Sequence, residues 1–203
     1  MDTVQRWNQT WEHLRVAPPG GVLQKLLGAY GESHRFYHTV QHLSECFGHL
    51  EECPTRAVDP GTLELAIWFH DAIYETKAGD SEAQSAAWMR SELGLLPRET
   101  LDRIEQLIMV TEHEAAPINL DQELLLDVDL SILGAPLVRF DEYEGQIRRE
   151  YSWVPEPAYR AARGKILAAF LERPVLYHTP HFRDGLEDQA RSNLSRSLGS
   201  LAV

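Results

Sequence analysis

The chain has 203 residues, 43% of them hydrophobic, which is enough to bury a substantial core without a second domain. Its formal net charge of −12, from 31 acidic and 19 basic residues, argues against binding to a nucleic acid polymer or an anionic membrane surface. A small ligand is the partner that this composition accommodates best, and homo-oligomer formation is left open.

The sequence has no apolar run near the roughly 20 residues that span a bilayer. Its start, "MDTVQRWNQTWEHL", lacks the apolar stretch of a secretion signal. We therefore expect a cytoplasmic protein without a membrane partner, built as one domain over residues 1–203. Cys46 and Cys53 are seven positions apart in a helical pattern, too far for an easy disulfide, and are expected to be free thiols.

Helical periodicity dominates the chain, and alternating strand patterns are scarce. Apolar residues recur three and four positions apart in residues 3–16, 21–30, 40–52, 61–73, 82–93, 98–112, 136–151, 157–172 and 183–201. Prolines and glycines separate most of these segments, as expected for helix ends. The sequence predicts an irregular all-α fold of about nine helices. Trp7, Trp11 and Leu14 form a helical stripe that is expected in the core.

The first chemical motif is "RFYHTVQH", residues 35–42. If a helix starts near Thr39 or earlier, His38 and His42 share one helical face and could point into the same space. Such a pair is also common without any function.

The second motif is "LAIWFHDAIYE", residues 65–75, in which His70 and Asp71 end a strongly apolar run. Adjacent helical residues diverge by about 100°, so both can serve one centre only near the end of the helix. Burying a carboxylate without a partner is unfavourable, and a divalent cation would bind the carboxylate and the imidazole together.

The third motif is "LLLDVDLSILGAP", residues 124–136, where two acids interrupt an apolar stretch. Asp121 and Asp127 have an ordinary explanation, because either could cap a helix or turn. Asp129 is harder to explain in this way, since an apolar segment that is expected to be buried follows it.

Together these residues resemble the HD superfamily of metal-dependent phosphohydrolases, which are all-α domains with an H…HD…D order of ligands. The resemblance is closest to an uncharacterised bacterial branch, through "YHTVQH", "FHD", "DVDLSILG" and "IRREY". Thr39 replaces the usual asparagine of the first motif, which removes an amide contact and leaves both histidines in place.

The first motif and "VDLS" also resemble the metal site of cyclic nucleotide phosphodiesterases. That resemblance implies metal ligands at His42, His70, Asp71 and Asp129. It implies that His38 is the general acid for the leaving group, and we assign Asp71 a catalytic role as well. Asp127 is left as a supporting or capping residue.

Two imidazoles and two carboxylates suit Mn, Fe, Co, Ni or Zn better than calcium, and Mg is allowed. The resemblance allows one or two ions, with Asp71 bridging and His113 as an extra ligand. Candidate cations for the phosphate are Arg35, Lys77, Arg148 and Arg163. Ordinary surface or structural roles remain open for each of them, and Glu150 and Tyr151 could be their buried partners. The loop "YETKAGDSEAQSA" is expected at the rim of the site.

Three functions are consistent with these observations. The first is hydrolysis of a phosphate ester of a small metabolite or nucleotide by a metal-activated water. The second is an HD-type di-iron oxygenase or lyase, although few additional ligands are visible. The third is a metal-binding regulatory module without turnover, which does not explain why His38 accompanies four ligands.

Overall fold

The computed structural model describes residues 2–113 and 115–201, which contain ten α-helices, one 3₁₀ helix and no strand. The predicted all-α class is therefore confirmed. In chain order the elements are α1 (Thr3–Leu14), α2 (Val22–Ala29), α3 (Val40–Glu52), α4 (Pro60–Phe69), α5 (Ser81–Glu92), α6 (Arg98–Val110), α7 (Leu120–Asp129), η1 (Leu130–Gly134), α8 (Leu137–Glu150), α9 (Glu156–Glu172) and α10 (Pro180–Leu201).

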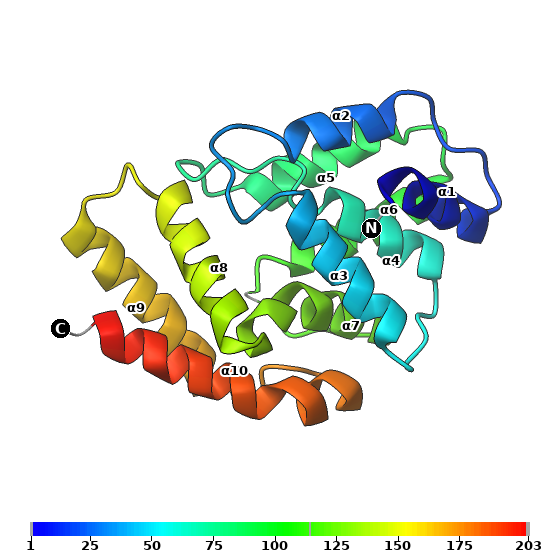
Figure 1. Cartoon of the computed structure of the whole chain (residues 1–203). Helices are drawn as coiled ribbons and strands as arrows, with labels where there is room; N and C mark the ends of the chain where they lie inside the picture. The colour runs from blue at the N-terminus through cyan, green and yellow to red at the C-terminus, as the bar shows by residue number, and fades with distance from the viewer. Residues whose placement is uncertain (1, 114, 202–203) are drawn as a thin grey trace.

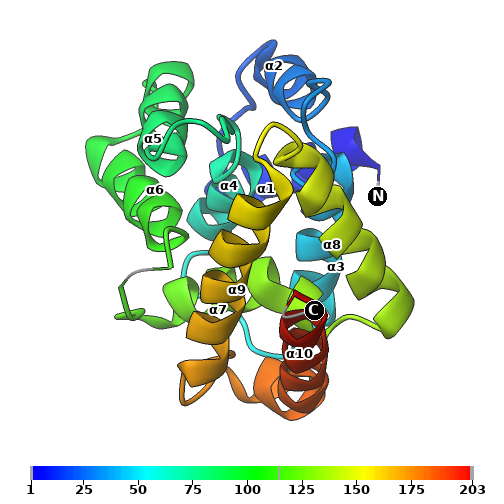
Figure 2. The same ribbon diagram turned by 90° about the vertical axis from the view of Figure 1, so that its left-hand side faces the viewer.

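The helices form two groups that meet around α3 and α7. Helices α1, α2, α5 and α6 gather at one end, and α8, α9 and α10 gather at the other (Figure 1). In the view from that second end, α9 lies in front, with α5 and α6 on one flank and α8 on the other (Figure 2). Helix α3 packs against both α4 and α7, so three segments that are distant in sequence meet in the interior.

The core is built on α4, which is buried on all sides. Asp59 caps this helix by accepting from the backbone N–H of Thr62, and Pro60 occupies its first turn. Every residue from Gly61 to Phe69 is buried, which is typical of a helix without a polar face. Trp7 and Trp11 of α1 pack against one another, and Trp7 also packs against Trp68, as the helical stripe predicted.

Helix α7 is absent from the nine predicted segments. Its middle turns, from Leu124 to Val128, are buried all round, so they lack the amphipathic spacing on which the prediction depended. Asn119 caps α7, and Asp121 instead accepts from the backbone N–H groups of Val58 and Asp59.

None of the helices described is both long and apolar enough to cross a bilayer.

Candidate metal centre

Four donor side chains reach one point from the ends of three helices. His42 lies in the first turn of α3, His70 caps the end of α4, Asp71 follows it, and Asp129 ends α7. Because α4 stops at Phe69, the adjacent His70 and Asp71 can both turn toward the same centre.

Each donor atom of this cluster lies close to at least two of the others. His42 Nε2 lies 3.1 Å from His70 Nε2, 3.5 Å from Asp71 Oδ2 and 3.2 Å from Asp129 Oδ1. His70 Nε2 lies 3.0 Å from Asp71 Oδ2 and 3.5 Å from Asp129 Oδ1. The structure therefore groups all four predicted ligands.

This spacing fits a transition metal. Metal–ligand bonds of about 2.0–2.2 Å place neighbouring donors about 3.0 Å apart at right angles and about 3.4 Å apart at tetrahedral angles. The His70 ring is also fixed for the task, because its Nδ1 lies 2.9 Å from the carbonyl oxygen of Ile67. A carbonyl oxygen can only accept a hydrogen bond, so Nδ1 carries the hydrogen in neutral His70. The lone pair of Nε2 then faces the cluster.

The charges of the cluster favour a cation at its centre. Burial lowers the pKa of His70, but the carboxylates of Asp71 and Asp129 outweigh it and hold that pKa well above its usual value. Burial likewise raises the pKa of Asp71, and the rings of His70 and His38 reverse this and lower it. The two carboxylates thus favour a positive charge between them, and a divalent ion would supply that charge.

His38 stands beside the cluster and outside it. Helix α3 begins at Val40 with Thr39 as its cap, so His38 precedes the helix and the predicted shared helical face is wrong. The rings of His38 and His42 still lie 6.0 Å apart, centre to centre. His38 stacks on Tyr74 at 3.9 Å and lines a cavity of about 410 Å³ that also contains His70, Asp71 and Asp129.

Glu150 orients His38. Its Oε2 lies 2.8 Å from His38 Nδ1, and its Oε1 accepts from the backbone N–H groups of Phe36, Tyr37 and His38 at 2.8, 2.8 and 3.0 Å. With Nδ1 held in this way, Nε2 is the ring nitrogen left for the cavity. Burial lowers the pKa of His38, but Asp71 and Glu150 outweigh it and raise that pKa.

Replacing Glu150 should change how stability depends on pH. Burial raises the pKa of Glu150, but His38 and the backbone N–H groups lower it to about 2 from 4.5. A lowered pKa stabilises the fold above the unfolded value, and this stabilisation is lost as the pH falls from 4.5 toward 2. By pH 3 the wild type should lose about 2 kcal/mol through this group, measured by urea unfolding.

Glu150→Gln is the matched variant, because its amide oxygen can still accept the three backbone N–H groups. Its unfolding free energy should fall less between pH 5 and pH 3 than that of the wild type. Equal slopes for the two proteins would contradict a charged Glu150. Glu150→Ala leaves several buried donors unpaired, and should be destabilised by about 3 kcal/mol or more at neutral pH.

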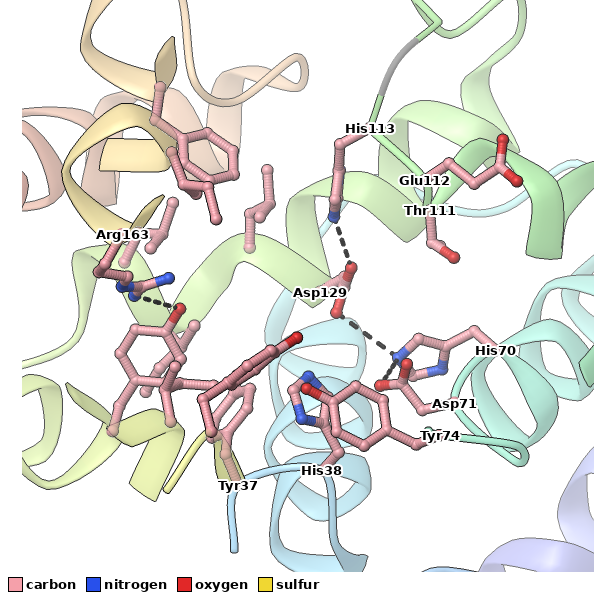
Figure 3. Close-up of a pocket in the computed structure, with 18 of the residues that line it drawn as sticks. Tyr37, His38, His70, Asp71, Tyr74, Thr111, Glu112, His113, Asp129 and Arg163 are labelled. Carbon is pink, nitrogen blue, oxygen red and sulfur yellow. Dashed lines mark hydrogen bonds and ion pairs between the residues drawn. The ribbon is translucent and has the colours of Figure 1, made fainter. Parts of the chain in front are cut away.

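His113 lies on the far side of Asp129. Its Nε2 is 3.0 Å from Asp129 Oδ2, while Asp129 Oδ1 faces His70 (Figure 3). Asp129 Oδ1 also lies 3.2 Å from His42 Nε2. Asp129 therefore connects the cluster to the residue predicted as an extra ligand. Glu82 and Glu112 line the cavity near this point.

The structure places the four predicted phosphate-binding cations differently. Arg163 lines the cavity, and the other three do not. Arg35 is buried and donates to the backbone carbonyls of Asp71 and Ala72, so its guanidinium positions the ligand loop and is not free for substrate.

Arg148 lies in the last turn of α8, and Lys77 lies in the loop between α4 and α5. Arg148 donates to the carbonyls of Tyr151 and Val154 and pairs with Glu156, which fixes the turn between α8 and α9. Lys77 is exposed, with Nζ 5.7 Å from the Trp153 ring. The guanidinium of Arg148 is therefore engaged in structural contacts, and the predicted phosphate binding by this residue is not supported.

Several residues near the site were not assigned from the sequence. Cys46 Sγ lies 3.7 Å from His42, and its position one helical turn further along α3 is a signal that could have located it. Glu150 carries no such signal, since it lies far from His38 in the chain. Asp127 has the supporting role expected of it: it accepts from the backbone of His178 and Thr179 just before α10.

Comparisons with protein-family models, with curated proteins and with solved structures found no match for this chain. The function therefore has to be argued from the residues of the cavity.

Proposed function

We propose that the chain is a metal-dependent phosphohydrolase of the HD superfamily, which hydrolyses a phosphate ester of a small metabolite or nucleotide. The supporting observation is that His42, His70, Asp71 and Asp129 present donors 3.0–3.5 Å apart beside a histidine held by a carboxylate. The order of these residues in the sequence resembles that superfamily.

A divalent transition metal in this cluster would lower the pKa of a water molecule and neutralise charge on the phosphoryl oxygens. Hydrogen bonds within the protein fix the positions of two of the four ligands. His70 is held by Ile67, and the loop at Asp71 is held by Arg35. This fixed geometry would present the ligands to a divalent ion, which would in turn hold a phosphoryl group in one orientation.

His38 is placed to donate the proton that the leaving oxygen needs. Its Nδ1 is held by Glu150, so Nε2 can carry a proton into the cavity. The carboxylate of Glu150 favours the protonated His38 ring that a general acid needs. Ester hydrolysis needs such an acid, whereas metal storage or regulation does not.

A panel of phosphomonoesters and phosphodiesters, assayed with and without chelator, tests the proposal. We expect hydrolysis of at least one class, loss of activity with chelator and recovery with Mn²⁺ or Co²⁺. Removal of the ion should also destabilise the fold, because an ion at a hundredfold excess over Kd contributes about 2.7 kcal/mol. The melting temperature should fall by roughly 5–10 °C.

Each alternative gives a different result in this assay. A regulatory module would show the melting shift with no turnover of any ester. A di-iron oxygenase or lyase would require two iron ions per chain and would leave the esters intact. A melting temperature that changes neither with chelator nor with added metal would contradict a metal centre of any kind.

A further inference from the structure

The cavity has a second half whose chemistry differs from that of the metal cluster. Its walls come from η1, α8 and α9, and include Leu133, Tyr143, Ile147, Tyr159, Ile166 and Phe170. Ile166 is 47% exposed, so part of this apolar wall faces water in the free protein. Arg163 marks this half in Figure 3, across the cavity from His70 and Asp71. Apolar surface in a concave site favours an apolar ligand group.

The polar groups of this half are already engaged or covered. The Arg163 side chain is 8% exposed and donates to Tyr143 and Glu144, and its unpaired Nε is buried away from the cavity surface. The apolar side chains therefore decide what this half of the cavity binds.

The charge of the cavity limits the ligand to few phosphates. Besides the proposed ligands Asp71 and Asp129, the residues described in its lining include two carboxylates, Glu82 and Glu112, and one arginine. Arg163 is already paired with Glu144, so it offers little free charge to a second anion. A chain of phosphates would meet repulsion beyond the metal cluster.

We propose that the substrate is an ester with a single phosphoryl group, whose leaving group is uncharged and largely apolar. The phosphoryl group lies at the four metal ligands, and the apolar group lies between α8 and α9. This inference rests on the proposed function for the phosphoryl end, and it adds the class of leaving group.

Calorimetry with phosphonates tests this without any turnover. Mn²⁺-loaded protein should bind phenylphosphonate at least tenfold more tightly than methylphosphonate, because only the first reaches the apolar wall.

Ala162→Trp provides an independent variant, since Ala162 is exposed at the edge of the cavity and a large ring there would cover the apolar wall. It should remove the preference for phenylphosphonate. Ala161→Trp is the matched control, because Ala161 is exposed on the same helix and does not line the cavity. It should bind both probes as the wild type does.

Equal affinity of the wild type for phenylphosphonate and methylphosphonate, or no binding of either, would overturn the inference. These outcomes are separate from the proposed function. Ester hydrolysis with equal phosphonate affinities would leave that function standing, while preferential binding without hydrolysis of any ester would contradict it.

Discussion

The His38→Ala protein should keep its metal and lose roughly 10²–10⁴ in turnover on esters with poor leaving groups, the usual contribution of a general acid. The reason is positional: His38 lies outside the four donors, with its Nδ1 held by Glu150 and its other nitrogen left for the cavity. Turnover and metal content should be measured on the same samples.

Nitrophenyl phosphates give the internal control for His38. A nitrophenolate leaves without a proton, so the loss in His38→Ala should shrink on these substrates. An alkyl or ribose oxygen needs a proton in order to leave, so the full loss is expected on those esters. Equal losses on both kinds of ester at full metal content would refute the proton-donor role, and loss of the metal would make His38 a ligand instead.

Alanine at any one of the four donors should lower metal content sharply and remove activity with it. Each donor lies within 3.0–3.5 Å of at least two others, so one truncation opens a gap in the coordination sphere. Elemental analysis of purified His42→Ala, His70→Ala, Asp71→Ala and Asp129→Ala proteins measures the effect, against close to one ion per wild-type chain.

His49→Ala is the matched control, because His49 lies on α3 with His42 but outside the donor group. It should keep its full metal content. If His70→Ala and Asp129→Ala bound as much metal as the wild type, the ligand assignment would fail.

The ligands could be predicted because their surroundings were visible in the local sequence. His70 and Asp71 end an apolar run, and Asp129 sits in another, so their burial and their need for a partner could be argued without coordinates. Helix α7 was missed for the same reason that Asp129 was found: its neighbours are apolar on every side, which removes helical periodicity.

The partners of the arginines and of His38 could not be predicted, because they depend on packing between distant segments. Arg35 was a reasonable phosphate ligand by type, yet the turn after α4 presents carbonyls to its guanidinium first. An arginine partner is one alternative that the sequence leaves open for Glu150, and the meeting of α8 with the segment before α3 gives it His38 instead. Charge and residue type do not encode such contacts.

The convergence of three helix ends on the donor cluster also bears on the order of folding. The donors come together only after α3, α4 and α7 have docked, so apolar packing has to compensate the entropy that is lost when these segments meet. An ion that binds only the finished arrangement stabilises the native state without stabilising the transition state for folding. Binding of the ion would therefore slow unfolding and leave the rate of folding almost unchanged.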